Sequence, residues 1–229
     1  MIFLTNIFNS EKVIPVLVLL WPLMLLSVVG CAGYRFKVVD NPFAQYDVKS
    51  IAVPMFQNTS SLANVAGPFT REIMNSLLRY PGLKVYSGEH KNTDAVLLGI
   101  VSSAPNVRAV TGSGGGTNVD IGGRKRFQVL TTSMVSLTLT LVLIKDPTQQ
   151  DIAYFLSTLS KLSFKPPRTI FSHSVGVSGS FGRAVDAGFG SDTGAVVNFT
   201  KNKGQESYIV LELAKRAAEN FREAVLYAF

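Results

Sequence analysis

The single cysteine of this 229-residue chain, Cys31, is the side chain whose type and setting point most directly to chemistry. It follows the segment Ser27-Val28-Val29-Gly30, which itself follows an apolar run from Val13 to Leu26. A thiol in this place can become a thioether that carries diacylglycerol, and the small residue before it lets the chain enter a peptidase cleft. Once Cys31 is acylated, no thiol remains for a disulfide, for thiol catalysis or for a cysteine-based metal site.

Residues 1–30 have the features of a cleaved signal peptide. The apolar run is about as long as a signal-peptide h-region and is shorter than the roughly 20 residues of a membrane span. With Cys31 it resembles the bacterial lipobox, so we predict a lipoprotein, and two or more acyl chains give a stable anchor. By resemblance to diderm lipoproteins, Ala32 favours export to the outer membrane. The alternative is a buried cysteine in an ordinary membrane segment.

The other reactive side chains form no persuasive catalytic set. His90 and His173 are the two histidines, and they lack the local spacing of a metal pair. Residues 176–179 match a nucleophile elbow only in part, and Gly112 to Gly116 lack the Gly-Lys-Ser/Thr of a phosphate-binding loop. We therefore expect a protein that is not an enzyme and has no metal or cofactor. A periplasmic hydrolase is the third interpretation, after the two given below.

One basic cluster, Arg124-Lys125-Arg126, stands between the glycine-rich segment and the longest predicted strand. Adjacent cations at the end of a flexible loop can bind an anion through charge-assisted hydrogen bonds. The alternative is a solvated strand entrance. Arg71 and Arg79 lie on a predicted helix, where the alternative is likewise a solvated face.

The composition favours acidic partners. The formal net charge is +7, and the predicted signal carries one lysine and one glutamate, so the mature chain keeps this charge. Export of the chain from the cytoplasm argues against nucleic acid as the acidic partner. The partners that remain are lipid A phosphate, acidic sugars, peptidoglycan or an acidic protein. The alternative is that the charge serves solubility alone. The mature chain of about 200 residues is long enough for one domain with a real core.

These candidate residues must be positioned by an alternation of strands and helices. Extended segments are predicted at 48–56, 83–86, 94–101, 127–144, 152–164 and 170–181. One amphipathic helix is expected from Gly67-Pro68 to Pro81-Gly82, and a second over 206–227. We therefore predict an α+β two-layer sandwich, with two helices on one face of a mixed or antiparallel sheet of about four to five strands.

The predicted organisation has three parts. Residues 1–30 are the signal peptide, residues 31–47 are a lipidated tether, and residues 48–229 are a single α+β domain. Within that domain, irregular loops are expected at 102–126 and 182–204, because both stretches are rich in glycine and lack a regular apolar period.

The first part of the mature chain resembles the lipopolysaccharide-assembly lipoproteins of the LptE family. Cys31 to Phe36 is similar to that family's Cys-Gly-Tyr-x-Phe start, with one extra alanine. Ile51 to Thr59 resembles its first strand, which ends in Pro-x-Phe-x-Asn. Phe69 to Val85 resembles its first helix and the segment after it, and Asp94 to Gly99 its next strand. The matches cover residues 31–101, and the C-terminal helix agrees in position.

The resemblance implies a non-enzymatic protein that is lipid-anchored at the outer membrane and faces the periplasm. LptE-like proteins lie inside or against the β-barrel LptD, and the pair delivers lipopolysaccharide to the outer leaflet. In this chain Arg71, Arg79 and the cluster Arg124, Lys125 and Arg126 become the candidate lipopolysaccharide-binding residues. The start at Ile51 also looks like lipoproteins that activate peptidoglycan synthases or form curli-type secretion pores, which is the alternative function.

Overall fold

The computed structural model describes residues 40–88, 92–103, 109–119, 127–157, 168–184 and 198–229. The chain divides into two compact units, Met1–Val38 and Val39–Phe229, and every element below belongs to the second unit. Cys31, His90 and the cluster Arg124-Lys125-Arg126 lie outside the described residues.

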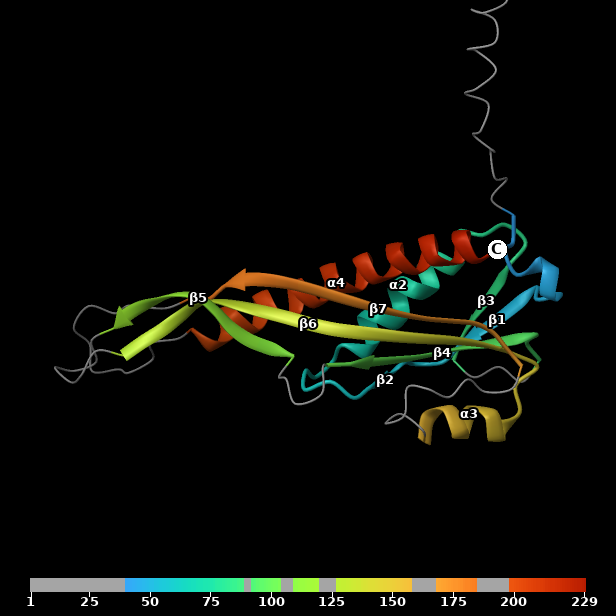
Figure 1. Cartoon of the computed structure of the whole chain (residues 1–229), viewed down its shortest axis with the longest axis horizontal. Helices are drawn as coiled ribbons and strands as arrows, with labels where there is room; N and C mark the ends of the chain where they lie inside the picture. Colours follow the sequence, from blue (N-terminus) through green and yellow to red (C-terminus); the bar gives the residue numbers. More distant parts are fainter. Residues whose placement is uncertain (1–39, 89–91, 104–108, 120–126, 158–167, 185–197) are drawn as a thin grey trace, which may run out of the picture. The chain divides into compact units, whose positions relative to one another are not determined.

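The described part of the second unit is built on a mixed sheet of seven strands (Figure 1). The strands are β1 (Ser50–Val53), β2 (Gln57–Asn58), β3 (Lys84–Ser87), β4 (Ala95–Ser102), β5 (Val110–Val119), β6 (Phe127–Lys145) and β7 (Thr169–Gly182). The order is β3-β1-β4-β6-β5, with β2 also paired to β4 and β7 to β6. Pairing is parallel among β1, β2, β3 and β4, and antiparallel around β6. The predicted α+β sandwich is confirmed, although it has more strands than expected.

The 19-residue strand β6 organises the sheet. β4 pairs with its residues 138–145, and β5 pairs with residues 127–135. β7 pairs with residues 132–144, which overlap both of these stretches. Because a strand has only two edges, β4 and β5 share one edge of β6 and β7 occupies the other. β7 is therefore a margin of the sheet.

The two predicted helices cover one face of this sheet. They are α2 (Ala66–Leu77) and α4 (Phe199–Ala228), which also pack against each other. Apolar residues of both helices meet alternate residues of β6 in one core. The members with least exposure include Phe69, Ile73, Leu77, Leu139, Leu141, Leu143, Leu213 and Phe221. The period of two in β6 and the helical period in α2 and α4 thus point to the same buried layer.

A third helix corrects the prediction for residues 152–164 over 152–157, and residues 158–164 lie outside the described residues. Residues 152–164 were expected to form a strand that pairs with β6, but Gln149–Ser157 form helix α3 and β7 takes that edge instead. Thr148 and Asp151 explain the helix. The Asp151 carboxylate accepts bonds from N and Oγ1 of Thr148, while Asp151 N donates to Thr148 Oγ1 at 3.2 Å. This reciprocal pattern is a capping box, which starts helices.

Helix α3 lies on the face of the sheet opposite α2 and α4. Its Ile152 packs against a second, smaller apolar cluster. That cluster consists of Ala52, Val96, Leu98, Ile100, Val142 and Ile144. The residues of β6 in this cluster have even numbers, whereas those facing α2 and α4 have odd numbers, as expected for a strand buried on both faces.

Both predicted loops are wrong in part. Val110–Val119 form strand β5 despite their glycines, because the ladder to β6 uses backbone groups and needs no side chains. At the second loop, β7 extends to Gly182 and α4 begins at Phe199, seven residues earlier than predicted. Asn198 caps α4, since its side chain accepts a hydrogen bond from Lys201 N at 2.9 Å.

The predicted tether over 31–47 is also too long. Phe43 is 1% exposed, and its ring lies 5.3 Å from the ring of Phe229. A short 3-10 helix, η1 (Ala44–Tyr46), follows it. The folded domain therefore includes residues before position 48, because Phe43 packs in the core against Phe229, an aromatic residue far along the chain.

Asp94 fastens the start of β4 to the start of β1. Its Oδ2 accepts bonds from Lys49 N at 2.9 Å, from Ser50 N at 2.8 Å and from Ser50 Oγ at 2.8 Å. These bonds, led by that from Lys49 N, hold the pKa of Asp94 below its ordinary value, although partial burial opposes this. The carboxylate form is therefore the one that stabilises the fold.

We expect Asp94→Ala to lower the free energy of unfolding by about 1 kcal/mol at neutral pH, since the site is partly solvated. Because the pKa of Asp94 is lower in the folded state, its contribution is present above the unfolded pKa and is lost as pH falls through the folded pKa. Urea titrations of both proteins over acidic pH measure this. A difference in unfolding free energy between the two proteins that stays constant down to the lowest pH would contradict this role of the Asp94 carboxylate.

Candidate functional site

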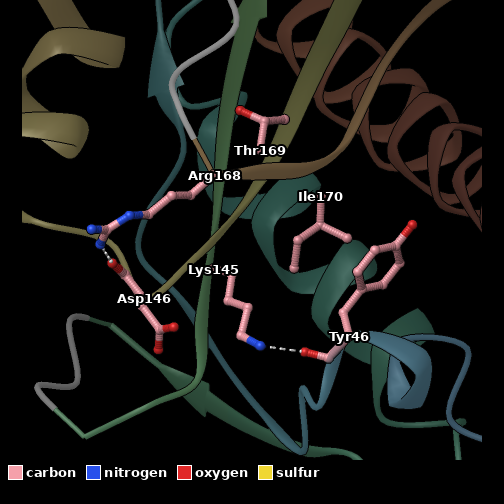
Figure 2. A pocket seen from close by; sticks show the side chains of 6 residues that line it. All are labelled: Tyr46, Lys145, Asp146, Arg168, Thr169 and Ile170. Atoms are coloured by element: carbon pink, nitrogen blue, oxygen red, sulfur yellow. Dashed lines mark hydrogen bonds between the residues drawn. The ribbon is translucent and has the colours of Figure 1, made fainter.

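A hollow of about 610 Å³ lies where β6 ends and β7 begins, beside η1 (Figure 2). We refer to it as the basic pocket. It is lined by Tyr46, Lys145, Asp146, Arg168, Thr169 and Ile170. The antiparallel pairing of Ile144 with Thr169 brings Lys145 and Arg168 to the same end of the sheet.

The two cations of the basic pocket are held in place without being neutralised. Lys145 Nζ donates to the Tyr46 carbonyl at 2.7 Å, and a guanidinium nitrogen of Arg168 donates to the Asp146 carbonyl at 2.8 Å. Figure 2 shows the Asp146 carboxylate projecting away from this guanidinium. Within the described part of the chain, neither cation forms an ion pair with a carboxylate. Both therefore keep N–H donors for an anion. Asp151 lies within electrostatic reach of Arg168, since its pKa is lowered mainly by its bonds from Thr148 and in smaller part by this guanidinium.

The backbone around the pocket is fixed in an uncommon conformation. Asp146 has a φ of 42° and Arg168 a φ of 70°, in the left-handed region that side chains other than glycine seldom adopt. Lys145 N donates to the Arg168 carbonyl at 3.1 Å, and Asp146 N donates to the Asp94 carbonyl at 2.9 Å. Such strained positions cost about 1 kcal/mol or more each and persist where the surroundings over-determine them. The pocket is thus preformed.

Anion binding is one chemistry that the basic pocket can support. A lysine and an arginine can meet a phosphate or carboxylate through charge-assisted hydrogen bonds. Tyr46, which is 38% exposed, and the half-buried Ile170 add apolar surface beside the charges. No histidine or cysteine lines this pocket. Across the described ranges no three metal-ligating side chains gather, and no described helix is both long and apolar enough to cross a membrane.

Arg71 and Arg79, which were predicted from sequence, do not line the basic pocket. Arg71 is exposed and pairs with Glu72 at 3.3 Å. Arg79 lies in a separate groove of about 220 Å³ between α2 and α4. That groove is lined by Glu72, Asn75, Ser76, Arg79, Lys215, Ala218, Glu219 and Arg222. Its three cations and two carboxylates give the groove a formal net charge of +1, which equals that of Lys145, Arg168 and Asp146 in the basic pocket. The groove differs in that its Lys215 already pairs with Glu212 at 2.9 Å.

His173 and residues 176–179, the remaining candidates from the sequence, lie on β7 in settings that fit structural roles. His173 lies on β7 with its ring 6.0 Å from that of Phe171, and burial lowers its pKa. A half-buried imidazole that is favoured in its neutral form beside a phenyl ring fits a structural role. The partial nucleophile elbow at 176–179 lies within extended β7 rather than on a strand-to-helix turn. It therefore lacks the geometry that exposes a nucleophile.

Lys145 and Arg168 were not singled out from the sequence, because 22 residues separate them. A local signal exists in retrospect. Lys145 ends the clearest alternating strand, and Arg168 directly precedes the next one. If those two strands pair as neighbours, residues at the end of one and the start of the other must meet. Because residues 152–164 were predicted as the strand that pairs with β6, it was not predicted that Lys145 and Arg168 lie side by side.

Comparisons with known proteins give no family. No protein-family model matches the chain, and no curated protein matches it. Among solved structures, the 'putative lipoprotein' of Caulobacter crescentus is 9% identical, with a TM-score of 0.39, covering 75% of this chain and 87% of its own. Rare lipoprotein B of Shewanella oneidensis is 8% identical, with a TM-score of 0.34 and coverages of 76% and 94%. Lipoprotein GNA1162 of Neisseria meningitidis is 14% identical, with a TM-score of 0.31 and coverages of 72% and 97%. Likenesses this distant carry no argument, so the function must rest on the sequence and the geometry of the site.

Proposed function

We propose that this protein is a non-enzymatic lipoprotein, anchored at the outer membrane and facing the periplasm, that assists lipopolysaccharide assembly. In this role it is a plug or partner of an LptD-like β-barrel and contacts lipid A. The observation that supports the proposal best is a basic pocket whose lining includes Tyr46, which follows the predicted anchor Cys31 closely along the chain. The resemblance of residues 31–101 to LptE is the reason for proposing lipopolysaccharide assembly as the process.

The reach of the chain links the pocket to a membrane surface. Asp40, the first described residue, is nine positions after Cys31, so at most about 30 Å of extended chain separates them. Tyr46 of the pocket follows six positions later, and buried Phe43 fixes the intervening backbone. A domain acylated at Cys31 can therefore bring Lys145 and Arg168 to the depth of lipid phosphates. Phosphate is the anion that lipid A presents.

Two sets of cations can be tested separately for lipopolysaccharide binding. We expect the triple change of Arg124, Lys125 and Arg126 to Ala to weaken binding by about tenfold to a hundredfold. We expect Lys145→Gln with Arg168→Gln to have an effect of similar size. Both effects should shrink in high salt, because exposed charges are screened within about 10 Å at 0.1 M.

The matched control is Lys84→Gln with Lys201→Gln, which removes two exposed lysines that lie outside both sets. Titration of purified protein with lipopolysaccharide measures the affinities, and circular dichroism verifies folding. An equal loss in the control would mean that net charge, rather than a site, governs binding. Unchanged affinity in both folded test variants would leave plugging of a partner as the role.

Co-purification from membranes separates the proposed function from its alternative. We expect a large outer-membrane β-barrel to be recovered with the protein and to be identified by mass spectrometry. Recovery of a penicillin-binding protein or of a ring oligomer would instead indicate an activator of peptidoglycan synthesis or a curli-type secretion component. Either of those results would overturn the LptD-like partnership.

A further inference from the structure

Among the described residues, the outer margin of β7 is a sheet edge with no strand beside it. β7 is 14 residues long and pairs with β6 on one side, while no described strand pairs with its other side. Its register with β6 is uninterrupted from Phe171 to Gly182. A long and regular edge of this kind presents a row of backbone donors and acceptors to any strand of matching shape.

The residues that present those groups can be identified from the ladder. Ser136 N donates to the Ala109 carbonyl at 2.9 Å, on the edge of β6 that faces away from β7. Its partner in β7 is Ser178, which must therefore direct its own N–H and C=O away from β6. Arg216 confirms this direction, because its guanidinium reaches the Ser178 carbonyl at 3.4 Å.

Alternation along the strand then gives six positions whose backbone groups point outward. They are Ser172, Ser174, Gly176, Ser178, Ser180 and Gly182. The side chains at all six are exposed serines or glycines. The only bond to any of these outward backbone groups within the described residues is the one from Arg216.

The edge lacks the features that normally prevent strand pairing. No residue from Thr169 to Gly182 is charged and none is proline. The other margins differ: β3 has four residues and begins with Lys84, and the ladder of β5 shifts register between Ser113 and Gly116. Of the described margins, β7 is thus the longest regular one, and Arg216 covers it at the Ser178 carbonyl.

We propose that β7 binds β7 of a second copy of this chain, antiparallel and about a two-fold axis at Val177. A second copy offers an edge of the same length that carries no charged residue of its own, whereas a closed barrel has no free edge to offer. This register pairs 172 with 182, 174 with 180 and 176 with 178, and forms about twelve backbone hydrogen bonds. Arg216 releases the Ser178 carbonyl when the partner strand arrives. The dimer goes beyond the proposed function and does not depend on it.

The first experiment uses protein that has been purified from membranes in a mild detergent and separated from any co-purified β-barrel. It measures the mass of this protein by light scattering with subtraction of the detergent. We expect the unaltered chain to be a dimer. Ser174→Lys with Ser178→Lys places two cations on the edge and should give a monomer at the same concentration. The control is Met134→Lys, which adds a charge on the same face but on β6, opposite Ser180, and should remain dimeric. A monomeric or higher-order unaltered protein would overturn the proposal.

The second experiment measures the geometry with spin labels in a Cys31→Ala background. Single cysteines at Gly176 and Gly182 suit this, because a Cβ at either position has no atom within 4 Å outside the adjoining residues. In the antiparallel dimer, the offset along the strand between equivalent labels is about 7 Å at 176 and about 33 Å at 182. Distances that do not increase from 176 to 182 would exclude this pairing, whatever the mass.

Discussion

Leu139→Asp is expected to leave the domain unfolded at neutral pH. Leu139 is fully buried in the middle of β6, facing the core that α2 and α4 cover. Its partners on the neighbouring strands, Val101 and Val175, are buried as well. A carboxylate there has no partner, and burying it costs several kcal/mol against a total stability of about 5–15 kcal/mol.

Circular dichroism and urea denaturation of the purified variant measure this loss. Thr138→Asp is the matched control, because it places the same charge one position earlier on the opposite, part-exposed face of β6. We expect the control to fold and to lose about 1 kcal/mol or less. A native-like melt for Leu139→Asp would be incompatible with the burial of the odd-numbered face.

Cys31→Ser is expected to abolish acylation and the retention at the membrane that depends on it. The serine hydroxyl cannot form the thioether, and each buried methylene of an acyl chain contributes roughly 0.8 kcal/mol. The loss of two or more chains therefore removes the whole anchor. Metabolic labelling with palmitate, followed by fractionation, measures both effects.

Ala32→Ser is the matched control for the cysteine variant. It makes a change of similar size at the adjacent position and leaves the thiol in place, so the palmitate label should remain. Label that persists in Cys31→Ser would mean that the anchor has been misassigned. In that case the reach from Cys31 to Tyr46 would no longer support a basic pocket at the membrane surface.

The elements that sequence patterns predicted well are those with a clear period. Alternation in β6 identified the buried Leu137, Leu139 and Leu141, and the helical spacing of Phe69, Ile73 and Leu77 identified the inner face of α2. In both cases, the side chains within one element suffice to define the face that must leave water.

The elements that were missed depend on contacts between distant residues or on backbone alone. Phe43 is buried because it meets Phe229, a partner that no local pattern contains. The glycines of β5 are held by the backbone of β6. Helix α3 had a local signal, the spacing of Thr148 and Asp151, which the apolar residues after it outweighed. The basic pocket required knowledge of which strand pairs with β6.

The edge-to-face contact of Phe43 with Phe229 has a mechanical consequence. Among the described residues, 40–43 are the first that a tension from a lipid at Cys31 would reach. The ring of Phe229 is also 5.6 Å from Tyr46 and 5.9 Å from Phe171. A load that reaches Phe43 is therefore shared at once by the end of α4, through Phe229, and by β7, through Phe171, rather than being carried by the four-residue strand β1 alone.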